Sequence, residues 1–295
     1  MKILIIHEGN RPDYPTYMLM RAAKSMGHEP FYVRMSRIDL EIGNKITMRV
    51  QGDTTLTAFK AGLIRSFGFL LSLAQFLRRI ALLTALERIM PLMNPPSALL
   101  SSRNKLLTTL MLKEAGIKVP YTFSTESLRS AYKVADTLGS SVVKPIIGSR
   151  GYGVALSPNP DTAFIMLKAL LSNKEPPLIQ EYLGGTGYDI RIIIVGDRVL
   201  GAMKRVASKS WKTNIAQGGK GEPYEVDGEL EDLALRATKA LGLWYAGVDV
   251  IIKGGEYYVL EVNGSPDWRE FTRVTGIDPS YEIVNYLVKV ADDYG

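Results

Sequence analysis

Two apolar strands that carry carboxylates place the strongest constraint on this chain. Residues 246–266 read AGVDVIIKGGEYYVLEVNGSP, and the two halves of this segment are rich in β-branched and aromatic residues. Such residues favour strands, and the turn residues Gly254 and Gly255 between them predict a β-hairpin. Glu261 and Asn263 are two positions apart on the second strand and therefore share a face.

The register of this hairpin determines whether Asp249 lies on the same face. With a regular two-residue loop, Asp249 would oppose Leu260 and point away from Glu261. A three-residue loop at 254–256 would pair Asp249 with Glu261, and a bulge in either strand would have the same effect. We expect Asp249, Glu261 and Asn263 to converge on a hard cation such as Mg²⁺, which prefers oxygen ligands. The alternative is a sheet whose polar face looks into water.

Composition limits the chemistry that the chain can supply. The chain has 295 residues, of which 46% are hydrophobic and 22% charged, as is ordinary for a globular protein of about two or three small domains. It has no cysteine and two histidines, which excludes zinc–thiolate sites and thiolate nucleophiles and argues against a Ser-His-Asp triad. Lysine plus arginine exceeds aspartate plus glutamate by 36 to 30, and this mild positive excess suits anionic small molecules.

Two apolar stretches raise the question of a membrane. The N-terminal MKILII is too short for the core of a signal peptide, and polar residues follow it at once. In residues 58–93 the longest uncharged run is the twelve residues between Arg65 and Arg78. A bilayer span needs about 18. We expect helices packed on a sheet in 58–93, with a basic amphipathic helix on a membrane surface as the alternative, and a cytoplasmic protein without a membrane partner.

The start of the chain has a βαβ pattern. A strand is expected at residues 2–6, a helix from about Thr16 to Met26 and a second strand at 31–35. The loop at 7–17 follows the carboxyl end of the first strand, where ligands commonly bind in open α/β sheets, although it lacks a dinucleotide fingerprint. We expect this loop to contact substrate. Pro95 and Pro96 mark a domain boundary.

A lysine begins the next predicted helix. This helix is expected to start at Ser101-Ser102 and to end at Gly116. Lys105 falls in its first turn, where a positive charge opposes the positive end of the helix dipole. A phosphate nearby would explain the lysine, and a solvated surface lysine is the alternative. The apolar stripe predicted to face the core is Leu106, Leu107, Leu110 and Met111.

A glycine-rich loop follows a second lysine. The segment 140–156, SSVVKPIIGSRGYGVAL, predicts a strand with Lys144, a loop at 148–153 and a returning strand. Successive backbone amides in such a loop can hold phosphate oxygens, and a basic side chain on the preceding strand can neutralise them. The loop has neither Walker A nor Rossmann spacing, and a plain glycine-rich hairpin is the alternative.

Further charged side chains occupy a predicted strand pair at 189–205. Asp189 and Arg191 share one face of the first strand, and Arg205 lies on the returning strand after a Gly-Asp turn. The polar segment at 208–226 has no strong periodicity, so we expect a functional loop there.

Seven segments together carry a resemblance to a known family. They are, in order, NPPSALLSSRNKLLTTLMLKEAGIKVP, VVKPIIGSRGYGV, QEYL, DIRIIIVGDRVLGAMKR, WKTNIAQGG, AGVDVI and LEVNGSPDWREFTRVTGID. Over about residues 94–290 the chain resembles the RimK-type ligases of the ATP-grasp superfamily. The resemblance implies an α/β protein, α+β in its ATP-binding part, with an ATP-grasp fold behind a Rossmann-like domain. The implied domains are 1–96, 97–185 and 186–295.

The resemblance also implies an activity. Enzymes of this type phosphorylate a carboxylate with ATP and let an amine attack the acyl phosphate. We therefore expect a carboxylate–amine ligase that uses ATP and Mg²⁺ (or Mn²⁺), forms a homo-oligomer and adds an amino acid, most often glutamate, to an acceptor. The implied acceptor is a carrier protein, a ribosomal protein tail or a cofactor. The alternatives are an ATP-grasp kinase and a nonenzymatic basic binding module.

Residue roles follow from the same resemblance. The implied nucleotide contacts are Lys105, Lys144, Gly148, Ser149, Gly151, Gly153 and Asp189, with Glu181 and Leu183 at the adenine. The implied metal ligands are Asp249, Glu261 and Asn263, and the implied catalytic residues are Arg191, Arg205, Lys212 and Asn214. The chain departs from the family at two positions. Gln217 precedes the glycine pair where the family usually has arginine, and Lys212 stands where some relatives have arginine. Each departure loses a fork-shaped donor for a carboxylate.

Overall fold

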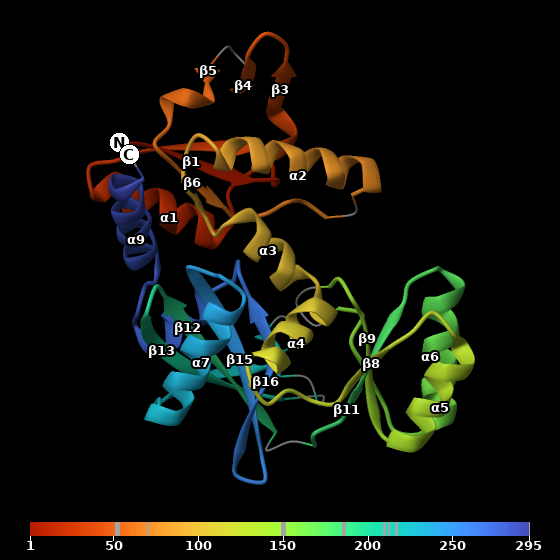
Figure 1. Cartoon of the computed structure of the whole chain (residues 1–295). Coiled ribbons are helices and arrows are strands. Elements are labelled where there is room, and N and C mark those ends of the chain that lie inside the picture. Colours follow the sequence, from red (N-terminus) through yellow and green to blue (C-terminus); the bar gives the residue numbers. More distant parts are fainter. Residues whose placement is uncertain are drawn as a thin grey trace.

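The computed structural model of the chain consists of helices packed on sheets, which confirms the predicted α/β class. The described residues are 1–50, 54–69, 71–148, 152–184, 187–208, 211, 213–215 and 218–294. Their strands form three larger sheets and one small three-stranded sheet. Figure 1 shows the N-terminal sheet in the upper part, the C-terminal sheet below it and the central sheet to one side.

The N-terminal sheet is parallel and follows the predicted βαβ start. Its strands, in spatial order, are β2 (Glu29–Arg34), β1 (Lys2–His7), β6 (Ala61–Ile64) and β7 (Leu92–Met93). Helix α1 (Tyr14–Ser25) connects β1 to β2, and the Asp13 side chain caps it by accepting a hydrogen bond from the Thr16 N–H at 3.0 Å. Residues 3–6 of β1 are fully buried, as expected for a parallel strand covered on both faces.

Residues 58–93 differ from the expected helices. Ala61–Ile64 form strand β6, which is buried at all four positions, and a short continuous apolar run suits such a strand. Helix α2 covers Leu73–Glu87 and begins with a capping box of Ser72 and Gln75. Within the described ranges, no helix is long and apolar enough to cross a membrane.

A small antiparallel sheet, which the sequence did not predict, projects from the N-terminal sheet. It consists of β3 (Ile38–Ile42), β4 (Ile46–Val50) and β5 (Thr54–Thr55), between the 3-10 turns η1 (Met35–Arg37) and η2 (Leu56–Ala58). Figure 1 shows it at the top of the molecule. Its inner side chains, such as Ile38 and Met48, belong to the same apolar core as Leu82 and Leu86 of α2.

The helix expected from Ser101 to Gly116 is two helices. Helix α3 covers Pro96–Arg103, and α4 covers Lys105–Glu114 with Asn104 as its N-cap. The expected apolar stripe is also partly wrong, because Leu106 and Leu110 are exposed while Lys105, Thr108 and Leu112 are buried. The break at Asn104 rotates α4 so that its lysine faces inward.

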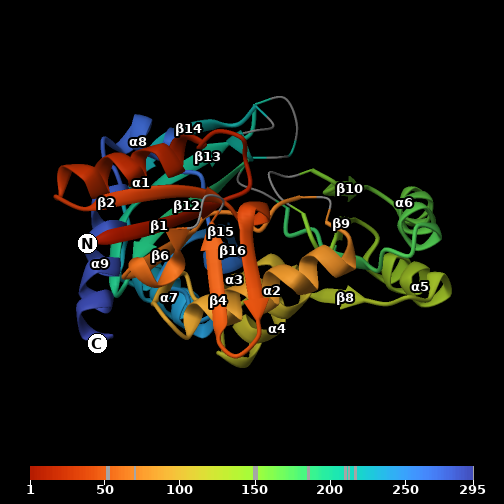
Figure 2. The ribbon, with the colours of Figure 1, turned by 90° about the horizontal axis from the view of Figure 1, so that it is seen from above.

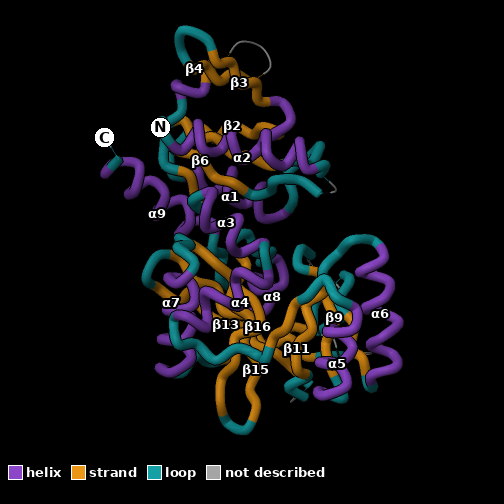
Figure 3. Tube along the Cα trace, turned by 45° about the vertical axis from the view of Figure 1, so that its right-hand side comes forward, coloured by secondary structure: helices purple, strands orange, loops and turns teal. Residues whose placement is uncertain are grey.

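The central sheet is small and has helices on one face. Its strands, in spatial order, are β10 (Ala155–Ser157), β9 (Ser141–Pro145), β11 (Pro177–Glu181) and β8 (Thr122–Ser124). Helices α5 (Leu128–Leu138) and α6 (Pro160–Ser172) lie side by side against this sheet, as Figures 1 and 3 show. The buried core between them consists of Ala131, Ala135, Val143, Ala163, Leu167 and Ile179.

The C-terminal sheet is antiparallel throughout. Its strands, in spatial order, are β14 (Lys220–Tyr224), β13 (Arg198–Val206), β12 (Tyr188–Val195), β15 (Tyr245–Lys253) and β16 (Glu256–Asn263). Helix α7 (Gly228–Ala240) packs on this sheet, and α8 (Arg269–Thr275) contacts β13 and β14. Strand β14 lies in the segment 208–226, which was expected to be a loop. It pairs with β13 from Ala202 to Val206.

In the hairpin of β15 and β16, Asp249 pairs with Glu261 as predicted. A β-bulge produces this pairing, and not a three-residue loop. The loop has two residues, Gly254 and Gly255, with φ of +60° and +81°, a conformation that glycine adopts without steric cost. A bulge next to Asp249 then shifts the register by one residue, so that Asp249 pairs with Glu261. Asp249 and Glu261 therefore share a face, as predicted.

The N-terminal and C-terminal sheets share one core. A single buried cluster contains Ile3 of the N-terminal sheet and Leu19 of α1 together with Tyr245, Trp268 and Phe271 from the C-terminal part. Helix α9 (Ser280–Asp293) packs against α1, which Figures 1 and 2 show beside the N-terminus. The domain boundaries 1–96, 97–185 and 186–295 stay a prediction.

Candidate active site

A cavity of about 300 Å³ lies between the central and C-terminal sheets. Strands β9 and β11 line it from one side, strands β12, β13, β15 and β16 from the other, and the first residue of α4 joins them. The predicted site residues that line it are Lys105, Lys144, Gly148, Glu181, Leu183, Asp189, Arg205, Asn214, Asp249 and Glu261. The fold thus brings together most of the predicted site from seven separate elements.

Four buried charges form a continuous ladder across the C-terminal sheet. The strand register places Asp189 opposite Arg205 and Arg191 opposite Asp249. Arg205 binds both oxygens of Asp189, at 2.7 and 2.6 Å, and its Nη2 lies 2.8 Å from Asp249 Oδ2. Arg191 also binds Asp249 through two nitrogens, with Nη2 at 2.7 Å from Oδ2. Such bidentate pairs fix both position and orientation.

The ladder controls the protonation of Asp249. Burial alone would raise the pKa of this carboxyl, but the two guanidinium groups of Arg191 and Arg205 outweigh burial and lower the pKa to about 2. The neighbouring carboxylates also raise the pKa of Arg205 against the effect of burial. Asp249 and Arg205 are therefore both charged at neutral pH.

Glu261 and Lys105 form a second, partly buried ion pair at the same cavity. Lys105 Nζ lies 2.6 Å from Glu261 Oε1, and Lys105 is 8% exposed. Burial raises the pKa of Glu261, and the charge of Lys105 more than compensates, so the pKa is lowered overall. The alternative of a solvated surface lysine at position 105 is wrong.

Lys144 differs from these groups because it has no ion-pair partner among the described residues, although the more distant charge of Glu261 acts on it. It lies on β9 and lines the cavity, and no carboxylate of the described ranges is within 4 Å of its amino group. Burial, together with the like charge of Lys105, lowers the pKa of Lys144 to about 8. A phosphate in the cavity would supply the missing negative charge.

The segment after β11 forms the other end of the cavity. Glu181, Tyr182 and Leu183 line it, and the Glu181 carboxylate accepts a hydrogen bond from the Tyr121 N–H at 2.8 Å. Across the cavity, Trp211 makes an edge contact with Tyr182, at 6.0 Å between ring centroids. The sequence analysis missed both aromatic residues, although Trp211 lies in the segment WKTNIAQGG that carried the resemblance.

Thr213 ties the segment around Trp211 to the charge ladder, and the sequence analysis missed it as well. Its hydroxyl donates to Asp189 Oδ2 at 2.7 Å. Asn214, the next residue, lines the cavity as predicted.

Three predicted residues lie away from the cavity lining. Arg191 is buried beneath Asp249, and Gly153 is in a turn with φ of +75°. Asn263 follows Glu261 on the same face, and its Oδ1 accepts a hydrogen bond from the Ser265 N–H at 2.9 Å. Ser149, Gly151 and Lys212 lie outside the described residues, as does Gln217.

The oxygen donors suit a magnesium ion that is shared with another ligand. The described residues contain no group of three or more His, Cys, Asp or Glu side chains arranged to hold a metal. Asp249, Glu261 and Asn263 offer oxygens, as Mg²⁺ requires, but two guanidinium groups already engage Asp249. Because Mg²⁺ usually keeps several non-protein ligands and binds nucleotide phosphates, this donor set fits a metal that arrives with a nucleotide.

Solved structures with the same overall arrangement define the class of protein. The ATP-grasp ligase PsnB, complexed with a minimal precursor, superposes with a TM-score of 0.76 at 23% identity, over 97% of this chain and 98% of that one. A RimK domain ATP-grasp protein from Sphaerobacter thermophilus has a TM-score of 0.75 at 20% identity, over 98% and 100%. The fold is that of the ATP-grasp ligases, which confirms the predicted fold.

Sequence comparisons identify the family. The family model of the RimK-like ATP-grasp domain matches residues 102–287. The tetrahydromethanopterin:alpha-L-glutamate ligase of Methanocaldococcus jannaschii is 35% identical over 72% of this chain and 75% of that protein. The alpha-aminoadipate–LysW ligase LysX of Sulfurisphaera tokodaii is 35% identical over 68% and 71%. The chain belongs to the RimK-like ATP-grasp family and is an ATP-dependent carboxylate–amine ligase, as predicted.

Proposed function

We propose that this ligase joins glutamate to the carboxylate of an acceptor. Several similar proteins are named glutamate ligases, among them a probable alpha-L-glutamate ligase of Trichodesmium erythraeum that is 30% identical over 94% of this chain. The observation that carries the proposal is the cavity between two sheets, with Lys105 and Lys144 on one side and the Asp189–Arg205–Asp249–Arg191 ladder on the other. This arrangement offers cations to anionic reactants on both sides.

In this proposal the lysines bind the phosphates of ATP. The adenine occupies the end of the cavity at Glu181 and Leu183, and the triphosphate extends toward Lys105, Lys144 and Gly148. A contact of Gly153 with the nucleotide stays a prediction. The γ-phosphoryl group moves to the acceptor carboxylate, the bond to ADP breaks, and an acyl phosphate forms. Fixed positive charges stabilise the charge that spreads over the transferring group, which is the main requirement of phosphoryl transfer.

Mg²⁺ would be held by Glu261, Asn263 and Asp249 together with the nucleotide. A structure of PsnB contains Mg and ADP, in line with this cofactor. When bound, the ion neutralises charge on the phosphates. Asp249 can bind the ion through an oxygen lone pair that Arg191 and Arg205 do not use, because a carboxylate has about four such acceptor positions. Use of Mn²⁺, a homo-oligomeric state and a cytoplasmic location stay predictions.

The second step joins the amine to the acyl phosphate. The amino group attacks the carbonyl carbon, inorganic phosphate leaves, and the nitrogen loses a proton. Arg205 and Asn214 face the cavity, where a guanidinium suits the acyl phosphate or the carboxylate of the amino acid. Arg191 acts through Asp249 and is a positioning residue in this proposal, while Lys212 stays a predicted contact.

An ADP-release screen that crosses amino acids with candidate acceptors tests the proposal. We expect release of ADP to require both an acceptor carboxylate and an amine, with glutamate the best amino acid. An ATP-grasp kinase would release ADP with a stable phosphorylated product and without any amine. Equal rates with every amino acid would contradict the choice of glutamate, and rates that ignore amines altogether would contradict ligation.

A further inference from the structure

The turn at the end of β16, residues 263–266, begins with the proposed metal ligand Asn263. Asn263 Oδ1 accepts a hydrogen bond from the Ser265 N–H at 2.9 Å, which fixes the position of this oxygen. A side-chain amide oxygen has two lone pairs, so one is left for a cation. The position of Ser265 therefore determines where the free lone pair of Asn263 points.

Arg65, which directly follows β6, holds this turn from the N-terminal sheet. Its carbonyl oxygen accepts a hydrogen bond from Ser265 Oγ at 2.7 Å, and its Nη2 donates to the Pro266 carbonyl oxygen at 3.0 Å. Its other terminal nitrogen, Nη1, donates to the Tyr245 hydroxyl at 3.0 Å, at the start of β15. Arg65 thus binds the turn through both its backbone and its side chain.

The stability of the fold alone does not explain an arginine at position 65. Arg65 is 6% exposed, and in the described part of the chain its guanidinium donates to two neutral oxygens while its buried Nε has no partner. The guanidinium also lies 5.0 Å from the Trp268 ring, and its charge acts on Asp13 from further away. Burying a cation without a directly paired carboxylate is costly. We therefore looked to the turn for the benefit that offsets this cost.

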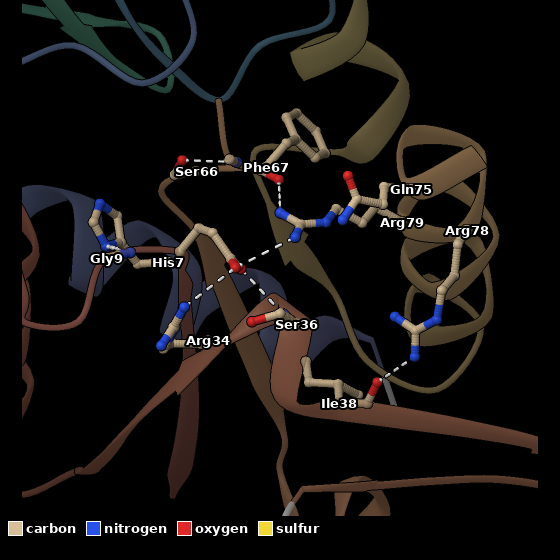
Figure 4. A network of polar contacts seen from close by, with 12 residues as sticks. His7, Gly9, Arg34, Ser36, Ile38, Ser66, Phe67, Gln75, Arg78 and Arg79 are labelled. Carbon is tan, nitrogen blue, oxygen red and sulfur yellow. Dashed lines mark hydrogen bonds and ion pairs between the residues drawn. The ribbon is translucent and has the colours of Figure 1, made fainter. Parts of the chain in front are cut away.

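The backbone that receives Ser265 is itself anchored in the N-terminal sheet. The Arg65 N–H donates to the Ile6 carbonyl oxygen of β1 at 2.8 Å. Two residues further on, the Phe67 carbonyl oxygen accepts a hydrogen bond from Arg79 Nη1 of α2 (Figure 4). Arg79 Nη2 lies 3.3 Å from Glu8 Oε1, so α2 is tied to the end of β1 as well. The carbonyl group of Arg65 therefore has a fixed place in the N-terminal sheet.

Asn94, the residue after β7, supports the same turn from a second strand. It is fully buried, and its Nδ2 donates to the carbonyl oxygens of Gly264 at 2.7 Å and Tyr245 at 2.8 Å. Its Oδ1 accepts hydrogen bonds from the N–H groups of Trp244 and Tyr245, at 2.6 and 3.0 Å. Both donors and both lone pairs of the amide are thus used, and Gly264 is fixed relative to β15.

The turn also packs against the charge ladder. Gly247 pairs with Asn263 across the hairpin, and a Cβ on Gly247 would lie 3.0 Å from Pro266 Cβ and 3.1 Å from Arg191 Cδ. The missing side chain leaves room for Pro266 beside Arg191. A displacement of the turn would therefore disturb both Asn263 and the arginine that positions Asp249.

We propose that Arg65 is a positioning residue for the metal site and acts through Ser265 on Asn263. Asn94 supports the same turn at Gly264. The N-terminal sheet then contributes to the binding of Mg²⁺ with the nucleotide, although none of its described residues lines the cavity. Groups that orient a metal ligand typically change metal affinity by about 10–100-fold when they are removed. This inference rests on the proposed function, because that proposal assigns Asn263 to the metal.

Calorimetric titration with ADP, in the presence and absence of Mg²⁺, tests this role without any turnover. We expect Mg²⁺ to raise the affinity of wild type for ADP. Arg65→Gln should lower the affinity by about tenfold with Mg²⁺ and leave it unchanged without Mg²⁺. Ser265→Ala, which removes the hydroxyl bonded to Arg65 and keeps every buried charge, should act in the same direction by a smaller factor. Tyr245→Phe is the matched control, because it removes the other partner of the same guanidinium and leaves the turn contacts in place.

A double-mutant cycle with Asn263→Ala tests whether Arg65 acts through Asn263. If it does, the double variant binds ADP and Mg²⁺ no more weakly than Asn263→Ala alone, because the ligand that Arg65 positions is already absent. Additive losses overturn the inference, as does an equal loss in Tyr245→Phe. A lower thermal midpoint in Arg65→Gln with an unchanged effect of Mg²⁺ would also overturn it, since Arg65 would then serve the fold alone.

Failure of this inference can be told from failure of the proposed function. If Asn263→Ala weakens ADP binding only with Mg²⁺ and Arg65→Gln does not, the metal site stands and the inference fails. If the two residues are coupled but ADP release never depends on an amine, the positioning role stands and the proposed ligation of glutamate fails.

Discussion

The C-terminal and central sheets face each other across one cavity but hold their charges differently. On the C-terminal sheet, Asp189, Arg205, Asp249 and Arg191 are buried and all paired with one another. On the central sheet, Lys144 faces the cavity without a carboxylate within 4 Å among the described residues, and burial lowers its pKa. The first sheet is electrostatically complete by itself, while the second presents a charge that a ligand must complete.

The apolar cores of the two sheets also differ, because the core of the C-terminal sheet is larger than that of the central sheet. The C-terminal sheet packs on two large clusters, one of which includes Ile3 of the N-terminal sheet and Leu19 of α1. The central sheet packs on a core in which three of the six buried residues are alanine. Because stabilisation grows with buried apolar area, the central sheet and its two helices are held together by a weaker core. A rigid, neutralised sheet therefore faces a less stable sheet that carries the unbalanced lysine.

The largest effect is expected from removing a carboxylate of the charge ladder on the C-terminal sheet. Asp249→Ala leaves Arg191 and Arg205 without their shared carboxylate, and removing one partner from a buried ion pair typically costs about 3–5 kcal/mol. We expect the free energy of unfolding, measured by urea denaturation, to fall by this amount. Asp232→Ala, which breaks the exposed pair with Arg236, should cost less than about 1 kcal/mol. Similar losses in both variants would contradict the importance of the ladder.

The next effect removes the unbalanced charge. Lys144→Ala should lower kcat/KM at limiting ATP by about 100-fold or more, as for loss of one preorganised group at a transferring phosphoryl. Its free energy of unfolding should change little, because no ion pair is broken. Lys133→Ala, on the exposed face of α5, is the control and should behave as wild type does. An unchanged ATP dependence in Lys144→Ala would show that this lysine does not contact the phosphates.

Glu261 lies on the C-terminal sheet, where it is both the ion-pair partner of Lys105 and a proposed ligand of Mg²⁺. A substitution at this position can separate these two roles. We expect Glu261→Gln to raise the Mg²⁺ concentration needed for half-maximal activity by about tenfold, a typical penalty for a weakened metal site, with the fold intact. Glu256→Gln makes the same change on the same strand, at the exposed pair with Lys118. A drop in activity that no concentration of Mg²⁺ changes would leave Glu261 as a partner of Lys105 alone.

The smallest effect is expected in the pH dependence of ATP binding, which reports the charge of Lys144. Since the pKa of Lys144 is about 8, its charge is present below pH 8 and is lost as the pH rises through that value. The apparent affinity for ATP should therefore fall about fivefold between pH 8 and 9, as expected for a group titrating near pH 8. Lys144→Arg, which stays charged, should show no such fall. A parallel fall in both proteins would assign the titration to another group.

The order of motifs in the sequence was sufficient for the family and for ten of the residues that line the cavity. Lys144, Asp189 and Arg205 were each predicted from local strand patterns and the resemblance, and each lines the cavity. The bulge beside Asp249 was harder to predict, because a two-residue loop by itself gives the opposite register. Tyr182 and Trp211 were missed because no local pattern distinguishes an aromatic residue at a ligand site from one in a core.

The sequence by itself determined the chemistry that is available: lysines, arginines and carboxylates on alternating strands, no cysteine, and a glycine-rich loop after a strand. Those properties depend on residue type and spacing, which are local. The charge state of the site depends on tertiary structure. Arg205 on β13 bridges Asp189 on β12 and Asp249 on β15, and Lys105 pairs with Glu261, which is 156 residues away in the sequence. The ion pairs of Glu8 are likewise tertiary, since Arg34 and Arg79 come from separate elements whose positions only packing fixes.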